Sequence, residues 1–350
     1  MGFITFIIVL SILVFVHELG HFTVARLLGV KVYVFSIGFG KKLITKHYKG
    51  TDWTFSLIPL GGYVKMKGQE DLNPALSNND ADSYNTKTPF QRILILLAGP
   101  FANFLLAFVV YIMIGLLGNN ALSPTIGKVI ENSPASLAGL KANDEIVKIN
   151  NMEIKTWDDL SDIIKNADGS LTFFIKREGK LISRTLYPKV SDSVNMFKEK
   201  IKKKMIGIAP APKLVKIHYS PLESISFAYD KTLEASKMIF LGVQKLIQGI
   251  VPHSEIGGVI SIGTVISDAS ASSFVALLTI TALISVNLGV LNLLPIPALD
   301  GGHIMFNLYE MITGLKPSEK MLINLTIGGW VILLGLMSLG LYNDINRLLG

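Results

Sequence analysis

The chain contains no cysteine, and only 17% of its 350 residues are charged. The absence of cysteine excludes disulfide scaffolds, thiolate metal sites and thiol nucleophiles, so any metal needs ligands from His, Asp or Glu. The charged fraction lies below the roughly 25% that is typical of soluble domains, whereas 50% of the residues are hydrophobic. The low charge and the high apolar content together predict a membrane protein.

The formal net charge of +7 does not by itself indicate a nucleic-acid partner. No nucleic-acid-binding motif accompanies the charge, and basic residues beside apolar runs more often report membrane topology. We therefore expect the lipid bilayer, and no nucleic acid, among the partners. The sequence leaves the oligomeric state open.

Four apolar stretches are long enough to cross a hydrocarbon core, which takes about 20 helical residues. The fold class predicted is a polytopic α-helical membrane protein with about four spans, a membrane-associated β-hairpin and an inserted α+β domain. The predicted segments are a first span at 1–30, a hairpin region at 31–67, a loop at 68–90, a second span at 91–118, a globular domain at 119–212 with its core at 122–190, a linker and amphipathic helix at 213–268, a third span at 269–303, and a loop with the fourth span at 304–350.

The first span differs from a secretory signal peptide, because the first basic residue, Arg26, follows the apolar run and does not precede it. We expect a retained helix. Lys and Arg are abundant between the first two spans, which predicts that this loop faces the cytoplasm and that 119–268 faces outward. Within the loop, KVYVFSIGF and WTFSLIP are rich in β-branched and aromatic residues and predict the hairpin, whereas 68–90 reads as a mobile loop.

The outward segment contains the phrase SPASLAGLKANDEIVKINN at 133–151, which resembles a PDZ domain of the bacterial protease type. Such domains accept an extended peptide or a carboxyl terminus as an added strand. An unrelated small α+β domain is the alternative. The helix expected within 213–268 carries apolar residues at three-and-four spacing, and it is equally consistent with a helix at the membrane surface and with one packed on the spans.

His17-Glu18-Leu19-Gly20-His21 is an HExxH motif inside the first span. The four-residue spacing puts both imidazoles on one helix face, where they can share one Zn²⁺, and Glu18 lies beside them to activate water. Ionisable residues within a span are costly, so a bound cation is a natural compensation; a proton relay or a helix–helix hydrogen-bond cluster is the alternative. A third ligand is needed, and Asp300 is the best candidate, with His303 as a weaker rival.

The motifs HELGH at 17–21, GGYVKM at 61–66, AGPFAN at 98–103 and NLLPIPALDGG at 292–302 together resemble the site-2 protease family, in particular its RseP-like branch. The resemblance covers nearly the whole chain, with room for one PDZ-like domain where the best-known member has two. It implies that His17, His21 and Asp300 bind zinc and that Glu18 is catalytic.

The resemblance also implies that Asn287 and Asn292 contact substrate, although interhelical hydrogen bonding explains them equally well on physical grounds. The implied substrates are single-span proteins such as anti-sigma factors, or signal-peptide remnants, cut by regulated intramembrane proteolysis in the bacterial inner membrane. The orientation of the spans separately predicts an active site near the cytoplasmic side, because the first and third spans both run inward and carry His17 and Asp300 toward their cytoplasmic ends.

Two other classes of protein compete with this interpretation. A membrane PDZ scaffold with a non-catalytic metal site has no need of Glu18. A transporter would also contain broken helices and intramembrane charge, but the sequence has no internal repeat. We further hypothesise that the hairpin offers a sheet edge near the metal to which an unwound substrate adds as a strand.

Overall fold

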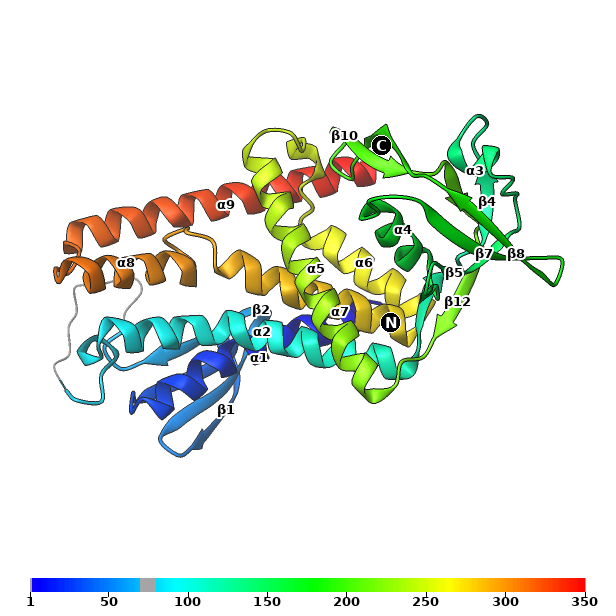
Figure 1. The fold of residues 1–350 in the computed structure, drawn as a ribbon. Helices are drawn as coiled ribbons and strands as arrows, with labels where there is room; N and C mark the ends of the chain where they lie inside the picture. The colour runs from blue at the N-terminus through cyan, green and yellow to red at the C-terminus, as the bar shows by residue number, and fades with distance from the viewer. Residues whose placement is uncertain (1, 70–79, 350) are drawn as a thin grey trace. The chain divides into compact units, whose positions relative to one another are not determined.

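The computed structural model describes residues 2–69 and 80–349 and divides into two compact units (Figure 1). The first unit combines Met1–Ile114 with Ser224–Gly350, and the second is Gly115–Glu223. The second unit is thus an insertion in the sequence of the first.

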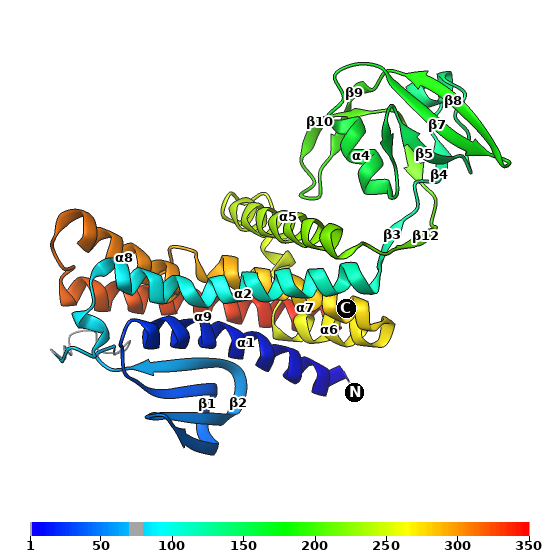
Figure 2. The same ribbon diagram turned by 60° about the horizontal axis from the view of Figure 1, so that its bottom comes forward.

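Four helices of the described chain are long and apolar enough to cross a membrane, which confirms the expected number of spans. In the most apolar part of each helix, at most half of the residues are buried within the chain, as expected of helices whose outer faces meet lipid. The four are α1 (Gly2–Leu27), α2 (Pro89–Leu117), α7 (Phe274–Asn292) and α9 (Glu319–Leu349) (Figures 1 and 2).

The apolar stretch expected as a third span at 269–303 is divided in the structure. It contains the end of α6 (Val259–Ser272), all of α7, a turn at 293–299 and the start of α8 (Asp300–Thr313). Ser273 separates α6 from α7, because its hydroxyl accepts a hydrogen bond from the Ala276 N–H and caps the new helix. Pro295 and Pro297 keep the turn at 293–299 from continuing α7.

Helix α5 (Pro221–Ile247) packs on the spans through its small residues. Ala228 and Ala235 are buried in one cluster with Ala107 of α2 and Val286 of α7. The structure therefore has the packed arrangement of the two that the sequence left open. Large apolar side chains of the same helix are exposed, among them Ile225, Tyr229, Leu233 and Phe240.

A long β-hairpin of β1 (Val32–Tyr48) and β2 (Thr51–Met66) follows α1 and folds back on itself. Ile37 lies opposite both Phe55 and Gly62, so the first part of β1 pairs with two parts of β2. The result is four short strand segments side by side, with 62–66 at one edge. The strands are longer than the expected runs because the chain bends at Gly38 and Gly40, both at positive φ, without leaving the sheet.

Part of the loop expected at 68–90, residues 70–79, lies outside the described residues. The part that follows them contacts the end of β2: Lys67 Nζ lies 2.7 Å from a carboxylate oxygen of Asp80 and 2.6 Å from one of Asp82. The Tyr84 N–H also donates to the Lys67 carbonyl at 2.8 Å. A short 3₁₀ helix, η1 (Tyr84–Thr86), then leads into α2; a second, η2 (His253–Glu255), precedes α6.

The second unit is an α+β fold with its own apolar core. Its main sheet has the order β6-β5-β7-β8, and Leu160 of α4 and Phe173 of β7 are fully buried in the core. β11 pairs with β4 and β12 with β3, so the unit continues beyond the expected core at 122–190. Its elements are β3 (Asn119–Leu122), β4 (Ile126–Val129), α3 (Pro134–Leu137), β5 (Glu145–Ile149), β6 (Met152–Glu153), α4 (Trp157–Lys165), β7 (Leu171–Arg177), β8 (Lys180–Leu186), β9 (Lys189–Val194), β10 (Lys200–Met205), β11 (Ile208–Pro210) and β12 (Leu214–Ile217).

Candidate active site

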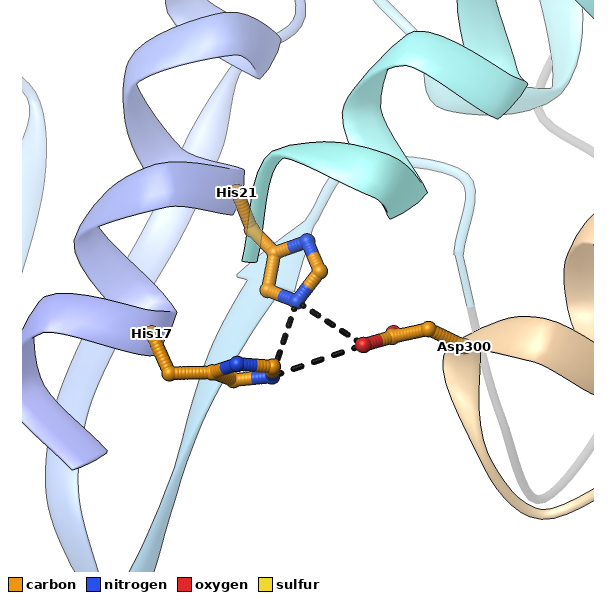
Figure 3. Close-up of side chains that lie close together, drawn as sticks. All are labelled: His17, His21 and Asp300. Atoms are coloured by element: carbon orange, nitrogen blue, oxygen red, sulfur yellow. Dashed lines mark hydrogen bonds and ion pairs between the residues drawn. The ribbon is translucent and has the colours of Figure 1, made fainter. Parts of the chain in front are cut away.

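The two histidines of the HExxH motif point the same way from α1. The rings of His17 and His21 are one helical turn apart, and their Nε2 atoms approach to 3.2 Å (Figure 3). His21 is buried and His17 is nearly so. Both side chains therefore offer a ring nitrogen to the same point.

Asp300 completes the cluster from a distant part of the chain (Figure 3). Its Oδ2 lies 3.4 Å from His17 Nε2 and 3.5 Å from His21 Nε2. Asp300 is the first residue of α8, directly after the proline-containing turn. The two following glycines let this helix start close to the turn, since a Cβ at Gly301 or Gly302 would overlap backbone atoms of 293–297.

The spacing of the three atoms fits a zinc ion. Zinc bound to His nitrogen and carboxylate oxygen at about 2.0 to 2.1 Å in a tetrahedron separates its ligand atoms by roughly 3.3 Å. The observed separations, 3.2, 3.4 and 3.5 Å, lie around that value. Three atoms with lone pairs repel one another unless a cation or shared protons lie between them. The two imidazole nitrogens and the carboxylate oxygen can therefore hold a metal, and three protein ligands leave the fourth position of a tetrahedral zinc site for water or substrate.

Helix α2 supports both imidazoles from behind. His21 Nδ1 donates to the Ile95 carbonyl at 2.8 Å, and His17 Nδ1 lies 3.2 Å from the amide nitrogen of Asn103. Donation from the far ring nitrogen to a fixed acceptor is the usual way in which a protein orients a metal-binding histidine. The Ile95 carbonyl can accept this hydrogen bond as well as one within α2, because a carbonyl oxygen has two lone pairs.

Gly99, between Ile95 and Asn103 on the same face of α2, makes room for the rings. A Cβ at this position would overlap His21 Nε2 and lie 2.8 Å from His17 Cε1. A Cβ at Gly20 of α1 would similarly overlap the Ala98 carbonyl of α2. Close approach of the two helices at these glycines is thus a condition for the geometry of the cluster.

The edge of the β-sheet borders the same site. A Cβ at Gly62 would lie 3.0 Å from Glu18 Cγ, so the edge strand passes directly beside the glutamate of the motif. The sheet is held against α1 by aromatic packing, in which Phe22 of α1 contacts Phe35 and Trp53 of the sheet with ring centroids 5.7 and 5.0 Å apart. The fold therefore places the edge strand, whose backbone can pair with a peptide, next to the Glu18 carboxylate.

A cavity of about 570 Å³ joins these groups. Its polar lining includes both histidines, Glu18, Asn103, Asn292 and Asp300, and its apolar lining comes from α1, α2, α7, α9, the hairpin and the turn before α8. A peptide segment entering this cavity would meet the ligand cluster, the glutamate and the sheet edge together.

The other predicted site residues lie in different surroundings. Asn292 lines the cavity, with its amide nitrogen 3.4 Å from His17 Nε2. Asn287 is half-buried and does not belong to the cavity lining found among the described residues. The two asparagines are five positions apart in the sequence, which turns them about 140° from each other on a helix. His303 is likewise outside the group of converging ligand atoms, and its ring packs on Phe306.

The sequence interpretation missed the contributions of Ile95, Gly99 and Asn103. The signal was present in AGPFAN, where a glycine and an asparagine are four residues apart, the same spacing as the two histidines. Every residue has a backbone carbonyl, so the sequence gives no sign that the carbonyl of Ile95 accepts a hydrogen bond from His21.

Apolar spanning helices that place two histidines, an aspartate and a glutamate around one cavity define a membrane metallopeptidase. The model of peptidase family M50 matches residues 5–336, and the chain belongs to this family, that of the site-2 proteases. The resemblance of the motifs to the site-2 protease family is confirmed at the level of the family.

Relatives of full length agree with this assignment. The chain is 47% identical over 348 residues to a Campylobacter jejuni protein provisionally named a zinc metalloprotease, Cj1068, with 99% of this chain and 94% of that protein covered. A Helicobacter pylori protein with the same provisional designation is 40% identical, covering 99% of this chain and 100% of the relative. The metalloprotease MmpA of Caulobacter vibrioides is 32% identical, covering 98% and 95%.

Proposed function

We propose that this enzyme is a zinc endopeptidase that hydrolyses peptide bonds of single-span membrane proteins within or beside the bilayer. His17, His21 and Asp300 hold the metal, and Glu18 activates water. The observation that carries the proposal is the convergence of three ligand atoms within 3.5 Å of one another, in a cavity bordered by spanning helices. The names of the relatives support zinc as the metal.

When bound, zinc supplies a Lewis acid that polarises the scissile carbonyl and favours ionisation of water. Glu18 takes the proton of the attacking water and passes it to the leaving amine. The Asn292 amide lies beside His17 and donates a hydrogen bond to the carbonyl oxygen as it gains charge. Asn287, on another face of α7, remains a predicted substrate contact.

Cleavage inside a membrane requires an unwound substrate, because the carbonyls of a helix are hydrogen-bonded. The strand segment at 62–66 pairs with β1 along one edge, and Gly62, Tyr63, Val64 and Met66 of the same segment line the cavity. We propose that the substrate adds to this edge as an antiparallel or parallel strand. Strand pairing uses the N–H groups of alternate residues, so N-methylation of a model substrate at alternate positions should block cleavage, and at the intervening positions should not. Equal effects at both sets would count against strand addition.

Substrates of this kind include anti-sigma factors and signal-peptide remnants, as the family resemblance implies, and the pathway is regulated intramembrane proteolysis.

The second unit is proposed to be the PDZ-like domain that inspects the outer end of the substrate or excludes bulky substrates. The pairing of β3 with β12 suggests how to remove it: a short Gly-Ser linker joining Ser123 to Lys213, whose backbones are bonded at 2.8 Å. If size exclusion operates, this variant should cut untrimmed substrates that the full chain refuses.

The proposed location is a bacterial inner membrane, with the active site near the cytoplasmic side and the second unit outside. The Lys and Arg residues between α1 and α2 support this orientation. Since the chain has no cysteine, single cysteines at Lys49 and Lys180 can be labelled without background. A membrane-impermeant thiol reagent should label the Lys180→Cys protein in intact cells and the Lys49→Cys protein only after lysis; the reverse pattern would overturn the orientation.

The central test combines metal analysis with cleavage of a transmembrane model substrate. Glu18→Gln should keep one equivalent of zinc and lose cleavage, because it preserves the ligands and removes the base. His21→Ala should lose both. A Glu18→Gln protein that still cleaves would exclude the proposed role of Glu18, and a wild type that cleaves without zinc would exclude the metal.

A further inference from the structure

Asn103 is a buried polar residue of α2 whose purpose the metal site does not by itself explain. Its side chain is fully buried inside an apolar span, where polar groups are costly. The amide nitrogen lies 3.2 Å from His17 Nδ1, whereas the amide oxygen has no hydrogen-bond partner among the described residues. Within the described part of the chain, the side-chain amide therefore has one polar contact, and that contact is with a proposed metal ligand.

The chemistry of a metal-bound imidazole decides which end of the amide faces His17. His17 turns Nε2 toward Asp300 and His21, so a metal at that point leaves the proton on Nδ1. An amide nitrogen opposite this N–H would place two donors face to face. The oxygen and nitrogen of an asparagine have nearly the same shape, and a half-turn of the amide exchanges them. Among the described residues the amide oxygen has no partner in its present position, so the half-turn gives up no hydrogen bond there and the contact with His17 determines the choice.

We infer that Asn103 is a positioning residue whose amide oxygen accepts the His17 Nδ1–H in the metal-loaded enzyme. The bond fixes the ring tautomer that presents Nε2 to the metal. This inference rests on the proposed metal site. It makes Asn103 the counterpart of the Ile95 carbonyl, which accepts from His21 at 2.8 Å.

The geometry of α1 and α2 explains why His17 contacts the side chain of Asn103 whereas His21 contacts the backbone carbonyl of Ile95. His21 lies against Ile95 and His17 against Asn103, so α1 and α2 are antiparallel at this point. Side chains of a helix lean toward its N-terminus, and the Asn103 amide thus covers the level of Gly99. Gly99 has no side chain, which leaves space there for the rings. A hydrogen bond from Ser285 Oγ of α7 to the Asn103 carbonyl, 2.7 Å long, holds this turn of α2 in place.

The test compares zinc affinity, by competition with a chelator, for wild type, Asn103→Leu and Asn103→Asp. Leucine has a similar size and no acceptor, whereas an aspartate carboxylate only accepts. We expect a 10- to 100-fold loss of zinc affinity for Asn103→Leu, the usual effect of removing such a partner. Asn103→Asp should stay within a few-fold of wild type. Equal losses in both variants, or no loss in Asn103→Leu, would overturn the inference.

Asn343→Leu is the matched control for removing a buried asparagine from the same unit. Asn343 is 7% exposed and donates to the His253 and Ile256 carbonyls, away from the metal ligands. This variant should bind zinc as wild type does.

A second measurement does not depend on folding of a variant. The ¹⁵N shifts of zinc-loaded wild type labelled at histidine should show His17 protonated at Nδ1, and protonation at Nε2 would contradict the inference. If wild type binds no zinc, the proposed function fails; if it binds zinc and Asn103→Leu binds equally well, only the role of Asn103 fails.

Discussion

Gly99 of α2 lies directly against His21 of α1, so that a single added carbon atom would overlap the ring nitrogen that faces Asp300. His17 is within reach of the same carbon. The position of both rings therefore depends on a residue that has no side chain.

Gly99→Ala should abolish or strongly reduce zinc binding. The new methyl group cannot move away, because it sits on a helix that packs closely on α1, so the rings must move and the ligand spacing is lost. Zinc content of the purified protein measures the effect. Gly335→Ala is the control, since a Cβ there meets no atom within 4 Å. Normal zinc content in Gly99→Ala would show that the helices can separate without disturbing the ligands.

Gly62→Ala should separate catalysis from metal binding. A Cβ at Gly62 would lie 3.0 Å from Glu18 Cγ and 2.7 Å from the Ser36 carbonyl, and so would displace the glutamate or the edge strand. We expect zinc content to be unchanged and the cleavage rate to fall on the order of 10- to 100-fold, as small misplacements of catalytic groups do. Gly328→Ala, in open surroundings, should cleave normally. Loss of zinc in Gly62→Ala would mean that the edge strand also supports the ligands.

The parts of the fold that the sequence predicts are those governed by local pattern. Apolar runs of span length identified α1, α2, α7 and α9, because few other structures need so many consecutive apolar residues. The division of the third stretch at Ser273 could not be predicted, since one serine in an apolar run is compatible with a continuous helix. Likewise, β-branched composition predicted a hairpin, but its return past Gly38 depends on pairings made only once the sheet exists.

In the candidate site too, the features set by local sequence pattern were predicted, and those set by the packing of helices were not. The spacing of His17 and His21 placed them on one helix face, and the need for a third ligand, together with the motif resemblance, favoured Asp300 over His303. Helix packing decides which face of α2 contacts the two rings. The contacts of Ile95, Gly99 and Asn103 with the histidines follow from that packing. Composition and periodicity carry no information on that relative rotation.

The ion pair between Arg92 of α2 and Glu310 of α8 should stabilise the helix that begins with Asp300. Arg92 Nη2 lies 2.8 Å from Glu310 Oε1, and the two side chains are only 12% and 13% exposed. Removing one partner leaves a poorly solvated charge, so Arg92→Met or Glu310→Met alone should destabilise the first unit by on the order of 3 kcal/mol and lower zinc affinity.

The double variant Arg92→Met/Glu310→Met should recover most of the stability lost in either single variant, because neither charge is then left alone. Thermal unfolding with and without added zinc measures both effects. The exposed pair Lys231–Glu234 serves as the comparison, and its removal should change stability by less than about 1 kcal/mol. Additive losses in the double variant would argue against coupling across the α2–α8 contact.

Asp144 and Arg177 should make the second unit sensitive to acid. Burial alone would raise the pKa of Asp144, but hydrogen bonds from Arg177 and the Lys141 N–H, together with their positive charges, lower it below its ordinary value. The Arg177 guanidinium holds both carboxylate oxygens, at 2.7 and 2.8 Å. A carboxyl whose pKa is lower in the folded state contributes stability above its unfolded pKa, about 3.9, and loses it as the pH falls below that value.

Hydrogen exchange of the β5 and β7 amides in the full chain reports the stability of this unit. For wild type, protection should fall steeply between pH 5 and pH 3, after correction for the intrinsic exchange rate. Asp144→Asn should be less protected at neutral pH, by on the order of 3 kcal/mol, and should vary less with pH because the titrating group is gone. Asp192→Asn, at an exposed position of β9, should behave as wild type. A pH dependence that persists unchanged in Asp144→Asn would assign the acid sensitivity to other carboxylates.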